Sequence, residues 1–321
     1  MSGLTAVLAA VAQPVLIAAG APLLIGGMRT VRARLEGRVG GGVLQPWRDL
    51  LKLLRKEPVS AAGTSWVFTA APVVLMATSL VIAVVVPYLS TQAVLPGAGD
   101  LFAVVAILLV GTVALTLAGL DTGTAFGGMG SSREITVAAL VEPTVLLSVF
   151  ALSVPAGSSN LAAIIRGRLD DPSTVASPTS LLALVALVVV TIAETGRLPV
   201  DNPATHLELT MIHEAMVLEY AGRDLALVEW ASWMRLSVLL GLIANLFVPW
   251  GIAGAGAGPG WLLPAAVVLA VKVGLLGALL AAAEVFLAKI RLFRVPELLA
   301  GSLVLAFLAV SGALLLPAVS Q

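Results

Sequence analysis

Residues 101–120 read LFAVVAILLVGTVALTLAGL, a run of twenty residues without a charge. A helix needs about 20 apolar residues to cross the hydrocarbon core of a bilayer. Seven further stretches are similarly apolar: 4–28, 67–88, 135–154, 178–194, 230–250, 261–283 and 297–317. Together they predict an all-α, polytopic membrane bundle of about eight transmembrane helices. Because no internal repeat or change of composition divides the chain, we predict one integral membrane domain over residues 1–321.

The composition excludes several classes of protein. Hydrophobic residues make up 59% of the 321 residues and charged residues 11%, against about 25% charged in average soluble domains. The 18 Lys and Arg residues balance the 18 Asp and Glu residues, so no net field attracts nucleic acid. The chain has no cysteine, which excludes cysteine-bound zinc and iron–sulfur clusters held by its own thiolates. Soluble, disordered and nucleic-acid-binding proteins are therefore excluded.

The first apolar stretch, 4–28, has an alternative interpretation as a cleaved signal peptide. A signal peptide begins with positive charge and has an apolar region of only about 7–15 residues. Here no Lys or Arg precedes Arg29, and the apolar run is longer. We therefore expect a retained first span.

The basic residues predict the orientation of the bundle. The links after the odd-numbered spans hold fourteen of the 18 Lys and Arg residues, whereas the opposite links hold only Arg166 and Arg168. Basic residues gather in cytoplasmic links. We therefore expect a multi-pass plasma-membrane protein with both termini extracytoplasmic. The fourteen are Arg29, Arg32, Arg34, Arg38, Arg48, Lys52, Arg55, Lys56, Arg133, Arg197, Arg223, Lys289, Arg291 and Arg294.

A short amphipathic segment lies in the first cytoplasmic link. Residues 44–57 read LQPWRDLLKLLRKE, with leucines at helical spacing and four cations on the other faces. Pro46 suits a first helical turn, and Pro58 ends the helix. We predict an interfacial helix that Trp47 anchors at the level of the lipid headgroups. A surface helix that only adds positive charge to the cytoplasmic side is the alternative.

The link over residues 194–229 is acidic although cytoplasmic links favour cations. It holds seven carboxylates, two arginines, both histidines of the protein and interleaved apolar residues. Asp201 or Asn202 is suited to cap a helix there, and Gly222 to end it. If such a helix buries one face, some carboxylates lose water and their pKa values rise into the range of proton exchange. A solvated acidic loop that docks a basic subunit is the alternative. The seven are Glu194, Asp201, Glu208, Glu214, Glu219, Asp224 and Glu229.

The two histidines do not form a recognisable metal site. The segment HEAMV at 213–217 lacks the second histidine of a zinc-protease HExxH motif. His206 and His213 are seven residues apart, about 10 Å along a helix, which is too far for one ion. We expect no metal, and a proton relay or ordinary hydrogen bonds for these side chains.

Few ionisable residues interrupt the apolar stretches. Glu142 and Lys272 lie well inside two of them, and Glu284 lies at the cytoplasmic end of 261–283. Because a charge in the bilayer centre costs about 2.5–3.5 kcal/mol, both interior residues must face the bundle, a wet cavity or each other. An ion pathway is one interpretation and a buried ion pair is the other. Arg235 lies near a span end, where it can snorkel. No nucleophile, phosphate-loop or dinucleotide pattern is present, so we assign no catalytic residue.

Two motifs resemble a known family. ETGRLPVD at 194–201 is similar to the E-T-x-R-x-P-F-D motif of complex I subunit 1, the membrane subunit at the quinone site. LQPWRDLLKLLRKE is similar to that family's L-Q-P-x-x-D-x-x-K-L-x-x-K-E. The family's eight spans, with both termini outside, agree with the expected topology. The resemblance covers nearly the whole chain, although its specificity lies in these two motifs.

The departures from the complex I pattern favour another branch of that family. Ala204 and His206 stand where complex I carries glutamates, and Val200 replaces the phenylalanine. The link AKIRLFRVPEL at 288–298 lacks the P-R-x-R-x-D-Q pattern. HLELTMIHEA at 206–215, followed by LEYAG, resembles the membrane subunits of formate hydrogenlyase and related energy-converting group 4 nickel–iron hydrogenases.

The resemblance implies a membrane anchor that docks a peripheral redox arm. The implied partners are hydrogenase-like catalytic and iron–sulfur subunits, which hold the nickel–iron and iron–sulfur centres, and antiporter-like membrane subunits. The chain itself would bind no metal, and binding of a quinone stays an open alternative. The resemblance of the motif implies a proton-relay role for four residues: Glu194, Arg197, Asp201 and Glu208. The other candidates are His206, His213, Glu214 and Glu219 from the hydrogenase-like stretch, and Glu142, Lys272 and Glu284 from the spans.

Two other functions remain as alternatives. A quinone-binding complex I subunit predicts a quinone-sized cavity between residues 44–57 and 194–229. A stand-alone ion transporter predicts ion flux by the isolated chain. The absent repeat and the absence of broken-helix patterns argue against the transporter.

Overall fold

The structure is a computed structural model, which describes residues 2–92, 96–201, 211–254, 256–288 and 290–319. This part of the chain is helical, with two isolated β-bridges and no strand. Its α-helices are α1 (Ser2–Leu35), α2 (Gln45–Leu54), α3 (Trp66–Val85), α4 (Leu101–Asp121), α5 (Ala125–Ala156), α6 (Leu161–Asp170), α7 (Pro178–Glu194), α8 (His213–Val217), α9 (Gly222–Phe247), α10 (Leu262–Phe286) and α11 (Val295–Val319).

Each predicted span corresponds to one helix, namely α1, α3, α4, α5, α7, α9, α10 or α11. Among the residues described, seven of these are long and apolar enough to cross a membrane. The eighth, α7, has 17 residues, a length of about 25 Å and the lower limit for a crossing helix. The predicted all-α, polytopic bundle is confirmed.

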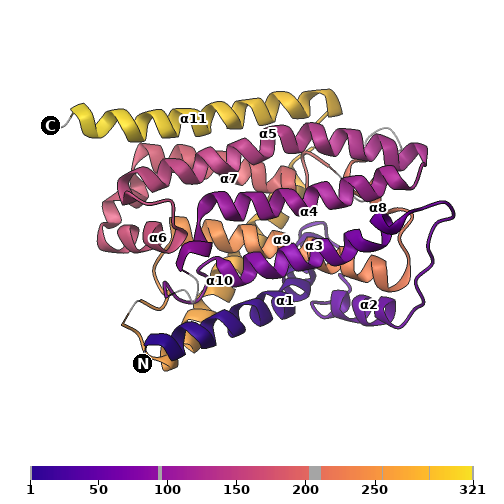
Figure 1. Cartoon of the computed structure of the whole chain (residues 1–321), viewed down its shortest axis with the longest axis horizontal. Coiled ribbons are helices and arrows are strands. Elements are labelled where there is room, and N and C mark those ends of the chain that lie inside the picture. Colours follow the sequence, from indigo (N-terminus) through magenta and orange to yellow (C-terminus); the bar gives the residue numbers. More distant parts are fainter. Residues whose placement is uncertain (1, 93–95, 202–210, 255, 289, 320–321) are drawn as a thin grey trace.

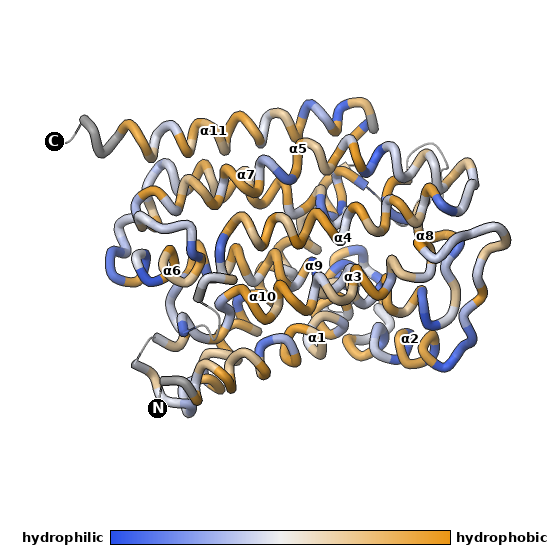
Figure 2. The backbone as a smooth tube through the Cα atoms, viewed as in Figure 1, coloured by the Kyte–Doolittle hydropathy of each residue, from blue (hydrophilic) through white to orange (hydrophobic). Residues whose placement is uncertain are grey.

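The long helices lie side by side, with both termini at one end of the bundle (Figure 1). Helix α6 lies at that same end, and α2 and α8 lie at the other end. Hydrophobic residues dominate the middle of the bundle, and hydrophilic ones gather towards its two ends (Figure 2). The basic first link and the acidic segment after α7 thus share an end. That this end faces the cytoplasm stays a prediction from the positive-inside pattern.

Helix α9 is the centre of the bundle. Every residue from Met234 to Phe247 is buried, so this half of the helix has no face towards lipid or water. A helix that is hydrophobic all round is the pattern expected of such a position. Tyr88 fixes it from outside the helix, because its hydroxyl donates to the carbonyl of Val238 at 3.0 Å.

The start of α9 differs from the prediction. The apolar stretch began at residue 230, but the helix begins at Gly222, so the segment 222–229 belongs to α9 and not to a loop. Ala226 and Val228 of this segment are buried, and burial of such residues extends the helix. Gly222 therefore begins a helix instead of ending one. Its φ is +56°, and a Cβ atom would lie 2.2 Å from the carbonyl oxygen of Glu57.

Two tryptophans attach α2 to the bundle. The indole of Trp230 on α9 donates to the carbonyl of Ala18 at 2.8 Å, and that of Trp47 on α2 donates to Ala19 at 3.2 Å. Pro22 has no N–H, so the Ala18 carbonyl has no i+4 partner within α1 and is free to accept. The two rings meet edge to face with centroids 5.7 Å apart. Together with buried Leu50, these contacts hold α2 against α1 and α9. An interfacial position in the membrane stays a prediction.

Gly26 lets the chain before α2 pass close to α1. A Cβ atom at Gly26 would lie 1.9 Å from the carbonyl oxygen of Val43, whereas one at Gly27 would meet nothing within 4 Å. We expect Gly26→Ala to destabilise the protein by about 1–3 kcal/mol relative to Gly27→Ala, because the two share the gain in helix propensity and only one clashes. Thermal unfolding of both detergent-purified variants measures the difference. Equal melting temperatures would disprove the close approach.

Candidate functional site: a charged cavity at one end of the bundle

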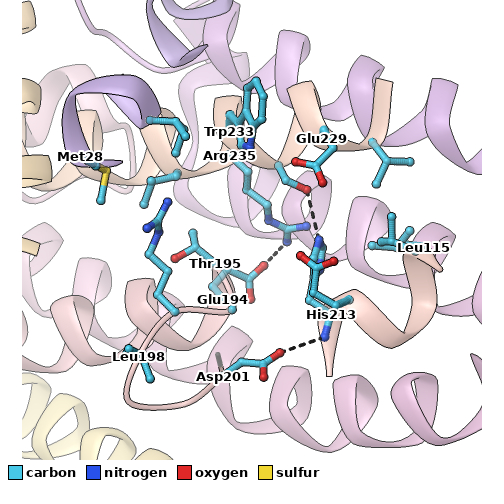
Figure 3. A pocket seen from close by; sticks show the side chains of 18 of the residues that line it. Met28, Leu115, Glu194, Thr195, Leu198, Asp201, His213, Glu229, Trp233 and Arg235 are labelled. Carbon is cyan, nitrogen blue, oxygen red and sulfur yellow. Dashed lines mark hydrogen bonds and ion pairs between the residues drawn. The ribbon is translucent and has the colours of Figure 1, made fainter. Parts of the chain in front are cut away.

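A cavity of about 240 Å³ is lined by α1, α3, α4, α5, α7, α8, α9, α10 and the segment that follows α7. Its lining is dense in ionisable groups, which Figure 3 shows converging from different helices. It holds most of the sequence-predicted candidates: Glu194, Arg197, Asp201, His213, Glu214 and Glu284. Five further ionisable residues that line it were outside that set: Arg29, Arg32, Glu134, Glu229 and Arg235.

An ion pair between α7 and α9 forms the inner wall of the cavity. Arg235 pairs with Glu194 (Figure 3). Its guanidinium also donates to the carbonyl of Leu108 at 2.9 Å and to Thr112 Oγ1 at 2.6 Å. The side chains of Glu194 and Arg235 are 4% and 10% exposed. The prediction that Arg235 snorkels is therefore wrong. Because α9 is central, the nearest compensation for its charge is Glu194 and not surface water.

A second set of ion pairs lies on the α10 side. Glu284, whose side chain is 6% exposed, accepts from Arg197 at 2.9 Å and lies 3.9 Å from a guanidinium nitrogen of Arg32. Arg32 also pairs with Glu36 at 2.9 Å within its own helix end. One buried carboxylate thus connects α10, α1 and the segment after α7. The motif residue Arg197 is held here instead of pairing with Glu194.

Asp201 organises the start of α8. Its carboxylate accepts from the backbone N–H groups of Ile212 at 3.1 Å and His213 at 3.3 Å. Asp201, the predicted capping residue, therefore does accept from the first N–H groups of a helix, but this helix begins more than ten residues further along the chain. Arg133 of α5 donates to the carbonyl of Met211 at 2.8 Å. These bonds fix His213 and Glu214 in the cavity wall.

The two α8 side chains have shifted pKa values. Burial lowers the pKa of His213, and the positive charge of Arg235 lowers it further against the opposing effect of Asp201. His213 is therefore neutral at pH 7, and its Nε2 lies 3.3 Å from Ser232 Oγ. Burial, together with the charges of Glu229 and Asp201, raises the pKa of Glu214 to about 7. Glu214 is thus able to exchange a proton near neutral pH.

Glu142 lies deeper in the bundle and does not line this cavity. It is 8% exposed in the middle of α5, and neither carboxylate oxygen has a hydrogen-bond partner among the residues described. Its electrostatic neighbours are Glu194 and Arg235. A buried polar group without a partner is uncommon and points to a water, an ion or a role in proton transfer.

The remaining candidates are not brought into the cavity. Lys272 meets neither the cavity nor Glu142, because its ammonium donates to the carbonyl of Val248 at the end of α9. Carbonyls at a helix C-terminus lack partners within the helix and carry partial negative charge, which explains why the ammonium group binds there. Glu219 is half-buried outside the lining. His206 and Glu208 lie outside the described residues.

Five ionisable residues that line the cavity were outside the predicted set, and one sequence pattern was available for two of them, Glu229 and Arg235. Glu229, Ser232 and Arg235 follow at intervals of three, which places them on one face of a helix. Taking 230 as the start of the span hid this face, because it separated Glu229 from the other two. Glu134 was missed because it directly precedes the apolar stretch that begins at residue 135.

Comparisons with known proteins agree with the two motifs. A sequence model of the family described as NADH dehydrogenase matches residues 6–314. The chain is 34% identical over 298 residues to formate hydrogenlyase subunit 4 of Escherichia coli, covering 92% of this chain and 95% of that protein. Hydrogenase-4 component C of Escherichia coli is 35% identical over 252 residues, 77% of each chain.

A solved structure and a complex I relative complete the comparison. A chain in the structure of the membrane-bound sulfane sulfur reductase, an archaeal respiratory membrane complex, superposes with a TM-score of 0.82 and 19% identity, covering 96% of this chain and 99% of that one. This likeness confirms the fold. NADH-quinone oxidoreductase subunit 8 of Rhodothermus marinus is 26% identical over 239 residues, 71% of this chain and 68% of that protein.

The predicted family and the predicted branch are both confirmed. The two relatives named for formate hydrogenlyase and hydrogenase-4 are more similar to this chain than the Rhodothermus subunit is. The apolar helices and this relationship identify a multi-pass membrane protein. The chain belongs to the NADH dehydrogenase family, that of complex I subunit 1, on the side of formate hydrogenlyase subunit 4.

Proposed function

We propose that this chain is the membrane-anchoring and energy-coupling subunit of a formate hydrogenlyase-like, group 4 hydrogenase complex, where it links electron transfer in a peripheral arm to ion translocation. One observation carries the proposal: six carboxylates and four arginines line a single cavity of about 240 Å³ at the end of the bundle that holds α2 and α8. Burying so many charges is costly unless they are paired or used.

The charges form a route from this end of the bundle towards its middle. Glu214 and His213 lie on α8, next to the segment that a peripheral subunit would contact. The Arg235–Glu194 pair follows, and beyond it lies Glu142, whose carboxylate has no hydrogen-bond partner in the described part of the chain. A change of charge at α8 alters the field on Arg235, which in turn favours or disfavours a proton on Glu142. In this proposal the chain moves charge and performs no bond chemistry.

The partners in this proposal bring the redox chemistry. Nickel–iron and iron–sulfur centres belong to peripheral catalytic and iron–sulfur subunits, which dock at the α2 and α8 end, since this chain has no cysteine. Antiporter-like subunits adjoin it within the plasma membrane and carry the ion. The relatives are subunits of multi-subunit membrane complexes, which supports partner subunits in general.

Purification of the tagged chain from its own membranes tests the assembly. We expect nickel–iron and iron–sulfur polypeptides to copurify in mild detergent. Reconstitution of that complex then tests coupling, with hydrogen-linked electron transfer and ion uptake measured in the same vesicles. Copurification without any redox polypeptide would contradict the proposed role.

Glu142→Gln separates coupling from electron transfer in these vesicles. We expect ion uptake to fall about tenfold or more while electron transfer in detergent persists, because the amide accepts no proton. Glu297→Gln is the matched control, since Glu297 is an exposed carboxylate in the first turn of α11. Equal ion uptake by Glu142→Gln and the control would exclude Glu142 from the route.

A quinone-binding role is less well supported by the cavity. Small-molecule pockets are mostly apolar and measure about 300–1,000 Å³, whereas this cavity is smaller and lined by charges. A quinone ring placed there would remove water from several carboxylates at once. The geometry therefore favours charge transfer through the cavity.

A further inference from the structure

A second, apolar cavity of about 390 Å³ lies between α1, α9 and α10. One face of α1 lines it from Leu16 to Val31, a length of about 22 Å. Leu23, Ala270 and Gly274 line it and are exposed, so the cavity is a groove that opens between α1 and α10. A single leaflet is about 15 Å deep, so the groove is long enough for an extended acyl chain.

The groove contains space that the protein does not fill. A Cβ atom added at Gly20, Gly27 or Gly274, all of which line it, would meet nothing within 4 Å. An empty apolar groove forfeits the dispersion contacts of its lining, and these contacts are restored by any chain that enters. The surrounding bilayer supplies such chains directly.

The polar groups of the groove are already committed. Tyr88 donates to the carbonyl of Val238 at 3.0 Å, and Ser237 donates to the carbonyl of Trp233 at 3.0 Å. The other lining residues are apolar or glycine. The described lining therefore offers no uncommitted hydrogen-bond donor to the carbonyls of a quinone ring, and it suits a plain hydrocarbon.

A cation continues the groove at the end of α1. Gly20, Leu24, Gly27 and Val31 line the groove at intervals of three and four, and the next position on this face is Arg34. Arg34 is exposed, and within the described part of the chain it forms no ion pair. Basic residues at the cytoplasmic end of transmembrane helices attract anionic lipid headgroups.

We propose that the groove between α1, α9 and α10 is a binding site for a phospholipid with an anionic headgroup. One acyl chain lies along the α1 face from Val31 towards Leu16, and the phosphate lies on Arg34. Met28 lines both this groove and the charged cavity, so the bound chain covers the bilayer side of that cavity. The lipid site does not depend on the proposed role in a hydrogenase complex.

Lipid retention by the purified, full-length protein in its complex tests the groove. Phospholipid per protein is counted by mass spectrometry after extensive detergent washing. The double variant Gly20→Leu with Gly274→Leu fills the open space, so we expect it to lose one retained phospholipid. Gly301→Leu is the matched control, because Gly301 is exposed on α11 and also has open space at its Cβ position. Equal retention by the double variant and the control, or a quinone in place of the phospholipid, would overturn the proposal.

Headgroup preference tests Arg34. The protein is equilibrated with vesicles of equal parts phosphatidylglycerol and phosphatidylcholine, and the retained lipids are compared. We expect wild-type protein to enrich phosphatidylglycerol, and Arg34→Gln to lose about fivefold of this enrichment. Arg55→Gln is the control, since Arg55 is an exposed cation away from the groove. Unchanged enrichment in Arg34→Gln would disprove the headgroup site.

Discussion

Replacing Arg235 with methionine is expected to lower the free energy of unfolding by about 3–5 kcal/mol, the largest stability change that we predict for this protein. Arg235 is the only cation that pairs with Glu194 among the residues described, and that carboxylate is 4% exposed. Methionine fills a similar volume but leaves the carboxylate charged and buried. It also removes donors from Thr112 and from the carbonyl of Leu108. Thermal unfolding of the detergent-purified protein measures the loss.

A second substitution shows whether charge is the cause. Adding Glu194→Gln to Arg235→Met removes the buried carboxylate charge that has lost its partner, so most of the lost stability should return. Ion translocation should not return, because the pair itself is gone. Arg223→Met is the control, since Arg223 is exposed in the first turn of α9. If the double variant is no more stable than Arg235→Met, the pair is not held by charge compensation.

The sequence predicted the bundle well because the bilayer imposes one simple requirement. About 20 apolar residues in a row can satisfy their backbone only as a helix in lipid. Runs such as 101–120 therefore identified α4 almost to the residue. Helix ends were less accurate where the helix continues beyond the apolar run. Because Arg223 and Asp224 are charged, the start of α9 was predicted as a loop. The side chains of Ala226 and Val228 in the same segment are nevertheless buried.

The candidate site could be predicted only in part. A sequence motif identifies the residues that belong to the site, but it does not identify the residues with which they pair. Glu194 was named from the sequence, yet its partner Arg235 lies 41 positions later and was assigned to the surface. Sequence spacing gives neighbours on one helix and not those on another. Lys272 shows the same limit, since its partner is a backbone carbonyl, and a carbonyl carries no residue-specific pattern.

The pH dependence of stability should change when Glu214 is replaced. Burial and the charges of Glu229 and Asp201 raise its pKa from 4.5 to about 7 in the folded protein. Between pH 4.5 and about 7 the folded state keeps the proton of Glu214, whereas the unfolded state has released it. The stability that Glu214 contributes is therefore fully present below pH 4.5 and is lost as the pH rises through 7. Glu214→Gln removes the ionisation. We expect the variant to be more stable than wild type at pH 8, by on the order of 2 kcal/mol, because Glu214 keeps part of its hydration.

The comparison between variant and wild type isolates this group from its neighbours. Burial lowers the pKa of His213, but His213 is present in both proteins and its contribution cancels to first order. Thermal unfolding at intervals from pH 4 to pH 8 should therefore show a stability difference that grows with pH. Glu297→Gln is the matched control, because that carboxylate is exposed in the first turn of α11. A difference that is constant across the range would mean that Glu214 contributes through packing alone. A proton-exchanging role at the cavity wall requires the difference to grow.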